Sequence, residues 1–257
     1  MGENGKDGKV IGSLVKAVDI LKSFENREEL GVSELAAGLG LHKSTVFSLI
    51  RTLEHLGLLE KSENTHKYRL GVELFRLGSM VSLNIRSLAR YELERLQSEV
   101  RETVHLAERS DRHVLFIERF ESAYAVKLYT VDAKPLPVYA TASGKAVLST
   151  MDDALVSKLI DRITFEQFTE NTICSGESLM EDIRATRERG FAVDNEEYEL
   201  GLYCVAAPLY DWRGRADYAV SVSGPKVRTA GENCNFITEQ VKKTAAVISE
   251  KHGYRGI

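Results

Sequence analysis

The chain has 257 residues, a net charge of −4, 43% hydrophobic residues and 28% charged residues, which is typical of a soluble globular protein with one large or two ordinary domains. The charge gives no global signal for nucleic-acid binding, so a basic surface would have to be local. No apolar run approaches a membrane span, no signal-peptide pattern is present, and the three cysteines have no CxxC spacing. We therefore expect a cytoplasmic protein with no membrane contact, no disulfide framework, no metal site and no cofactor.

The first seventy residues predict a winged helix-turn-helix. Three helices are expected at Ser13–Phe24, at Ser33–Ala37 and at Lys43–Leu56, with a turn at Gly38–Gly40 between the last two. After Gly57, which suits a left-handed helix cap, two short strands at 58–61 and 67–70 would form the wing.

The third helix presents polar and basic side chains opposite its apolar face, and a helix of this kind fits the major groove of B-DNA. The wing adds cations that would lie along the DNA backbone. The expected DNA contacts are Lys43, Ser44, Thr45, Phe47, Ser48, Arg51, Lys61, His66, Lys67 and Arg69. The alternative is a scaffold whose winged module binds protein, and a salt-sensitive shift of DNA would discriminate between the two.

The rest of the chain predicts an α+β domain with a mainly antiparallel sheet and helices packed on it. Strands are expected at 103–108, 114–119, 123–130, 191–194, 203–210 and 216–223, and helices at 143–150, 152–161, 178–189 and 233–252. We expect three parts: residues 1–71 as the DNA-binding domain, 72–83 as a linker helix and 84–257 as the second domain. The apolar stripe of the helix at Leu83–Val100 would be either core or a seam with a second copy, and we favour the seam.

Two polar features of the second domain predict a small-molecule pocket. The helix start at Ser143–Lys145 offers free backbone N–H groups that could hold a carboxylate, although it lacks the phosphate-loop pattern. Asp194, Cys204, Ser221 and Ser223 are compact polar groups near sheet strands, with both serines on one face. An ordinary helix start and structural polar groups remain the alternatives, and no spacing supports a catalytic pair between Cys204 and a histidine.

The sequence resembles the IclR family of bacterial transcription regulators. The similarity lies in ELAAGLGLHKSTVFSLIRTLEHLGLLE, YRLG and YATASGKAVL, and then in RERGFAVDNEEYELGLYCVAAPLYDWRGRADYAVSVSGP. The resemblance implies a winged N-terminal domain, a linker helix and a GAF-like effector domain. It also places effector contacts at Ala142, Ser143, Gly144, Asp194, Cys204, Ser221 and Ser223. Ser48 stands where the family usually has a basic residue.

We therefore expect a ligand-responsive regulator that binds double-stranded operator DNA as a homodimer or tetramer and is not an enzyme. A repressor of a catabolic operon is favoured, with a small carboxylate such as an aromatic, keto or sugar acid as its effector. The alternative is a small-acid hydrolase that uses Cys204 and carries the winged module as an accessory.

Overall fold

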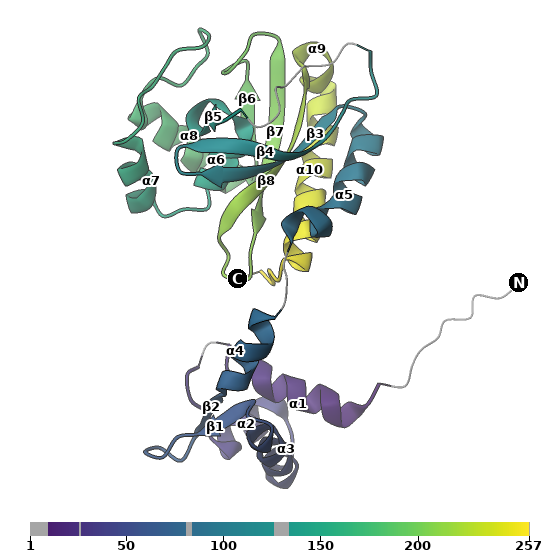
Figure 1. Cartoon of the computed structure of the whole chain (residues 1–257), viewed down its shortest axis with the longest axis vertical. Helices are drawn as coiled ribbons and strands as arrows, with labels where there is room; N and C mark the ends of the chain where they lie inside the picture. The colour runs from purple at the N-terminus through teal and green to yellow at the C-terminus, as the bar shows by residue number, and fades with distance from the viewer. Residues whose placement is uncertain (1–9, 26, 81–83, 126–133, 257) are drawn as a thin grey trace, which may run out of the picture. The chain divides into compact units, whose positions relative to one another are not determined.

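The computed structural model describes residues 10–25, 27–80, 84–125 and 134–256. The chain divides into two compact units, Met1–Ser82 and Leu83–Ile257 (Figure 1). Each unit has its own hydrophobic core.

The N-terminal unit is a three-helix bundle with a two-stranded wing. Its elements are α1 (Gly12–Lys22), α2 (Val32–Leu39), α3 (Lys43–His55), β1 (Leu59–Lys61), β2 (Tyr68–Leu70) and α4 (Val72–Ser79). The strands β1 and β2 are antiparallel, with Glu60 opposite Arg69. The apolar face of α3 enters the core through Val46, Ile50 and Leu53, as the 3.6-residue periodicity predicts.

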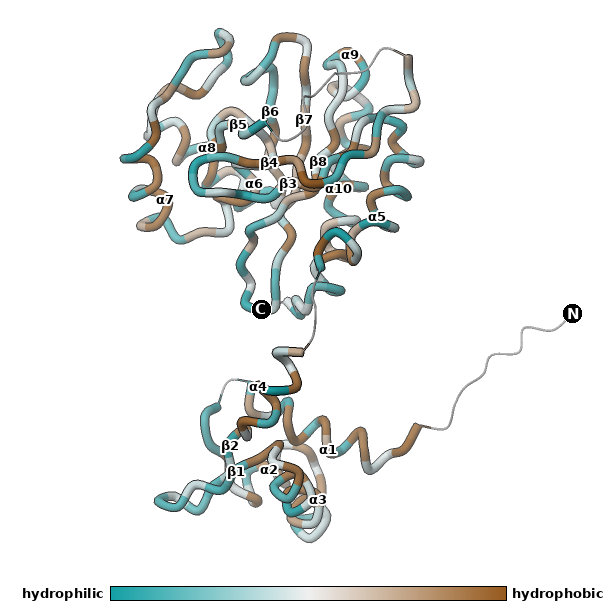
Figure 2. Tube along the Cα trace, in the orientation of Figure 1, coloured by the Kyte–Doolittle hydropathy of each residue, from teal (hydrophilic) through white to brown (hydrophobic). Residues whose placement is uncertain are grey.

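Three local expectations for this unit are wrong. Gly38 and Leu39 belong to α2, which ends at Gly40 in the left-handed conformation (φ 63°), so the turn begins later than predicted. Leu56 is the cap of α3 and is exposed, because the helix ends before this position can face the core. On α1, Leu14, Val15 and Val18 are exposed, although their helical spacing with Leu21 and Phe24 predicts one buried apolar face. Figure 2 shows the apolar residues along this helix.

The C-terminal unit is built on a six-stranded antiparallel sheet with the order β5-β4-β3-β8-β7-β6. The strands are β3 (Thr103–Ser110), β4 (His113–Phe120), β5 (Leu136–Pro137), β6 (Ala192–Asn195), β7 (Leu202–Tyr210) and β8 (Ala216–Pro225). The helices are α5 (Ile85–Val100), α6 (Ala142–Leu148), α7 (Asp153–Ile160), α8 (Gly176–Arg189), α9 (Lys226–Thr229) and α10 (Glu232–Lys251), and a 3-10 turn, η1, covers Val138–Ala140. The α+β expectation is confirmed. Of the strand expected at 123–130, residues 123–125 form a bend and the remainder lies outside the described residues.

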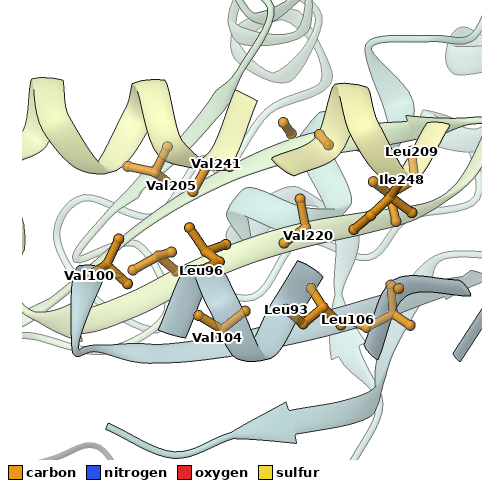
Figure 3. Packing of buried hydrophobic residues seen from close by; sticks show 14 of the residues in the cluster. Leu93, Leu96, Val100, Val104, Leu106, Val205, Leu209, Val220, Val241 and Ile248 are labelled. Atoms are coloured by element: carbon orange, nitrogen blue, oxygen red, sulfur yellow. The ribbon is translucent and has the colours of Figure 1, made fainter. Parts of the chain in front are cut away.

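The two faces of the sheet carry different cores, because successive side chains of a strand point to opposite faces. One face packs on α5 and α10 through residues such as Leu106, Val205 and Val220 (Figure 3). The other face packs on α6 through Ala206 and Ala219. The apolar stripe of α5 therefore lies inside the core of its own unit, and the expected seam with a second copy along this helix is wrong.

Candidate functional site

A cavity of about 200 Å³ lies on the face of the sheet that carries α6. Six of the seven predicted effector residues line it: Ala142, Ser143, Asp194, Cys204, Ser221 and Ser223. The other lining residues are Phe116, Lys134, Leu136, Thr141, Tyr198, Glu199 and Leu202.

Strand register explains how residues far apart in the sequence meet here. Asp194 on β6 is opposite Cys204 on β7, and Cys204 is opposite Ser223 on β8. Ser221 occupies the next row on the same face, between Ala206 and His105. The pairing thus forms a polar floor across the strands, as the spacing of the two serines predicted.

The seventh predicted residue, Gly144, does not line the cavity. Its backbone N–H donates to the Thr141 hydroxyl over 3.2 Å, so that N–H already has a partner. A Cβ atom at Gly144 would lie 2.3 Å from the Val138 carbonyl oxygen. The glycine therefore allows α6 to begin against η1, which is a packing role.

Asp194 is an unusual carboxyl group, with only 2% of its surface exposed. It accepts a hydrogen bond of 2.8 Å from the backbone N–H of Glu197. Burial, followed by the negative charge of Glu197, raises the pKa of Asp194 to about 7. The group is therefore close to half protonated at neutral pH.

Behind the cavity lies a buried ion-pair cluster that the sequence did not reveal. Lys145 is 1% exposed, and its Nζ donates to both carboxylate oxygens of Glu197 at 2.6 and 2.7 Å. The same Nζ lies 3.2 Å from Asp182 on α8. These contacts tie the loop after β6 to α6, so the Gly-Lys pair that resembled a phosphate loop serves to hold the cavity wall.

Ser221 offers a hydrogen-bonding group that is not satisfied within the described residues. Its side chain is fully buried, it lines the cavity, and its Oγ has no hydrogen-bond partner there. A buried hydroxyl without a partner costs free energy, typically about 1–3 kcal/mol. A ligand with a polar atom at this position would recover that cost.

The cavity favours binding over nucleophilic chemistry. Burial raises the pKa of the Cys204 thiol well above its ordinary value, so the thiol stays protonated at neutral pH and is a poor nucleophile. Burial also lowers the pKa of His105 to about 3, and its ring stacks on Phe116 with 4.0 Å between centroids. No cluster of His, Cys, Asp or Glu among the described residues fits a metal ion.

In the N-terminal unit the predicted DNA-contact residues fall on one side of α3 and on the wing. Lys43, Ser44, Ser48 and Arg51 are exposed, as are Lys61 and His66, whereas Thr45 is half-buried. Phe47 keeps 48% of its surface exposed and lines an open groove between α3 and the wing together with Arg51, Glu54, His55, Lys61 and Tyr68.

Two wing cations already have partners within the unit. Lys67 lies 3.0 Å from Glu34, and Arg69 lies 3.2 Å from Glu60. Both ion pairs are solvent-exposed and weak, so either cation can exchange its carboxylate for a phosphate.

Comparison with protein families gives two matches that together span most of the chain. Residues 13–63 match the IclR helix-turn-helix domain, and residues 78–250 match the C-terminal region of bacterial transcriptional regulator IclR. This chain belongs to the IclR family. It is thus a DNA-binding transcriptional regulator of a family whose members are not enzymes.

Relatives in the IclR family cover nearly the whole chain. The transcriptional regulator XynR of Escherichia coli is 34% identical over 95% of this chain and 98% of its own length, and KdgR of the same organism is 30% identical over 95% and 94%. Two crystal structures are similar. The Agobacterium tumefaciens repressor BlcR is 26% identical, the match covers 96% of this chain and 99% of BlcR, and the TM-score is 0.76. The Thermotoga maritima IclR is 29% identical, the match covers 95% of this chain and 99% of that protein, and the TM-score is 0.65. Within the part of the chain that the structure describes, no helix is long and apolar enough to cross a membrane.

Proposed function

We propose that this IclR-family protein is a cytoplasmic, effector-responsive repressor of a catabolic operon, and that its effector is a small carboxylate held in the cavity of the C-terminal unit. The observation that carries the proposal is the unsatisfied hydroxyl of Ser221 in a cavity shared with Asp194 and Ser143. A cavity of this size fits about seven water molecules at about 30 Å³ each, so it suits a small organic acid.

Repression is favoured over activation by the names of relatives. The transcriptional repressor IclR of Escherichia coli is 29% identical over 95% of this chain, and BlcR is also named a repressor. In this proposal residues 1–71 bind DNA, 72–83 form the linker helix and 84–257 bind the effector.

The proposed DNA interface is the exposed side of α3 with the wing. Lys43 and Arg51 would contact phosphates or guanine edges from α3, and Lys61 and His66 would follow the backbone from the wing. The helix α3 carries few basic residues, and Ser48 occupies a position where the family usually has one. A single copy should therefore bind DNA weakly.

A second copy is expected to supply the missing affinity, because two half-sites bound together gain from effective concentration. The exposed apolar face of α1, with Leu14, Val15 and Val18 at helical spacing, supports a contact between two N-terminal units. The unit also exposes Val72 and Phe75 on α4, which would extend the same contact. This replaces α5 as the proposed site of pairing.

The test is a mobility shift with the DNA upstream of the protein's own gene, titrated with salt and then with small acids. A salt-sensitive shift that an acid releases in the wild type, and not in a Ser221→Ala, Ser223→Ala double variant, is the expected result. A shift that no acid changes would remove the effector assignment, and the absence of any shift would remove the DNA-binding assignment.

A further inference from the structure

The carboxylates that line the cavity or lie directly behind it outnumber the neighbouring cations. Asp194, Glu197 and Asp182 gather around Lys145, the one lysine that is buried among the residues described. Glu197 and Asp182 both contact the Lys145 Nζ, whereas Asp194 has no ion-pair partner among the described residues. Arg189 reaches Asp182 at 3.5 Å and compensates part of that charge, but it does not contact Asp194.

The remaining titratable groups around Asp194 do not change this balance. They are Glu199 and Tyr198 on the loop after β6, Lys134 before β5, Cys204 on β7 and His105 on β3. Cys204 and His105 are neutral at neutral pH, because burial disfavours their charged forms. Lys134 is exposed and donates to the Tyr198 hydroxyl over 3.2 Å, and Glu199 adds a further negative charge.

An anionic ligand that enters this cavity would lie beside an ionised, buried Asp194 unless that carboxyl group first takes up a proton. Two carboxylates that share a buried site cannot both be ionised at low cost, and a pair that shares one proton is the stable arrangement. A protonated Asp194 would also place an O–H donor in the same cavity as the unsatisfied Ser221 hydroxyl.

We propose that the effector is a monocarboxylate that binds to the protonated form of Asp194, so that each effector bound to an ionised site takes one proton from the solvent. This inference rests on the proposed function, because it takes the cavity as the effector site. It separates three ligand classes. A neutral amide has no anionic acceptor for the protonated Asp194. A protonated amine would favour the ionised form of Asp194, so its binding would release a proton. A dicarboxylate would bring a second negative charge toward Glu199.

The proton uptake has a defined size. With the pKa of Asp194 at about 7, the free site is mostly ionised at pH 8 and mostly protonated at pH 6. Uptake should therefore be about 0.9 protons per ligand at pH 8 and about 0.1 at pH 6. The affinity for the acid should be about tenfold weaker at pH 8 than at pH 6.

The experiment is calorimetric titration of the full chain with sodium pyruvate, sodium gluconate and sodium 4-hydroxybenzoate, each compared with its primary amide. Each titration is run at pH 6 and pH 8 in two buffers with different ionisation enthalpies, which gives the number of protons taken up. The expected result is that at least one acid binds with the stated proton uptake and that its amide binds much more weakly.

Asp194→Asn is the informative variant, because an amide N–H₂ keeps a donor in the cavity and cannot ionise. It should bind the same acid with no proton uptake and with equal affinity at both pH values. The control is Glu181→Gln on α8, which removes an exposed carboxylate outside the cavity lining and should leave the proton count unchanged.

Three results would each overturn the inference. An acid could bind at pH 8 without proton uptake, an acid and its amide could bind equally well, or none of the three acids could bind. Its failure is distinguishable from failure of the proposed function. If an amide or amine releases the protein from its operator, the regulator stands and the carboxylate–Asp194 pair falls. If DNA never binds, the regulator falls whatever the proton count.

Discussion

Replacement of Lys145 by methionine should destabilise the C-terminal unit by about 3–5 kcal/mol at pH 8. Methionine is one atom shorter than lysine and keeps most of its apolar packing. It leaves Glu197 and Asp182 without the positive charge that lies 2.6 and 3.2 Å from them. Lys145 is 1% exposed, so solvent cannot compensate. For a domain of this size, the loss corresponds to a melting temperature lower by about 10 °C.

The loss should shrink as the pH falls. Burial is the largest influence on Glu197 and raises its pKa, and Lys145 opposes that increase. Without Lys145 the pKa of Glu197 should rise further, so the folded state binds a proton that the unfolded state lacks at the same pH. Stability of the variant therefore improves from pH 8 toward pH 5 relative to the wild type.

Urea unfolding followed by circular dichroism at pH 8 and pH 5 measures both effects. The control is Lys158→Met, which removes an exposed lysine from α7 and should change stability by less than about 0.5 kcal/mol. A Lys145→Met variant within about 1 kcal/mol of the wild type at pH 8, or a deficit that grows as the pH falls, would refute the account of the cluster.

Three further predictions concern other parts of the chain. If Phe47 contacts the methyl group of a thymine, Phe47→Ala should reduce the preference for thymine over uracil in operator DNA by about fourfold, because burial of one methyl group contributes about 0.8 kcal/mol. A mobility shift in which the variant keeps the wild-type preference contradicts this base contact. Gly144→Ala should lower the melting temperature, because its Cβ would lie 2.3 Å from a carbonyl oxygen of η1. Gly38→Ala should raise the melting temperature, because this glycine is in a helix and its added Cβ would meet nothing within 4 Å. Equal effects of the two substitutions would disprove the close approach at Gly144. Leu14→Glu with Val18→Glu should shift the sedimentation of a residue 1–82 fragment from dimer to monomer, whereas Lys16→Glu should not; a fragment that is already monomeric removes α1 as the pairing surface.

Elements with a clear hydrophobic period could be predicted from the sequence. The apolar face of α3 follows from the 3.6-residue spacing of its apolar residues. The shared face of Ser221 and Ser223 follows from their spacing of two residues on one strand. The expected cavity residues come together because each lies on a strand or helix start of this kind.

The predictions that failed concern contacts between residues far apart in the sequence. The stripe of α5 was assigned to a second copy, because a sequence does not say which apolar surface lies opposite. Here the opposite surface is formed by α10 and one face of the sheet. The role of Lys145 was missed because Glu197 is 52 residues away and sits on a loop without periodicity. Lys134 and Phe116 carry no motif, and their place in the cavity follows only from the order of the strands.

The packing of α5 on α10 has a consequence for synthesis. These are the first and last long helices of the C-terminal unit, and Lys251 near the end of α10 lies 2.8 Å from the buried carboxylate of Glu92 on α5. While the chain emerges from the ribosome, the N-terminal unit can fold early, but the stripe of α5 is covered only in part, by the sheet, until α10 has been made. A nascent chain stalled before Glu232 would therefore present an incompletely covered apolar helix to chaperones, and the ability to sense a ligand would arise only after α10 has been made.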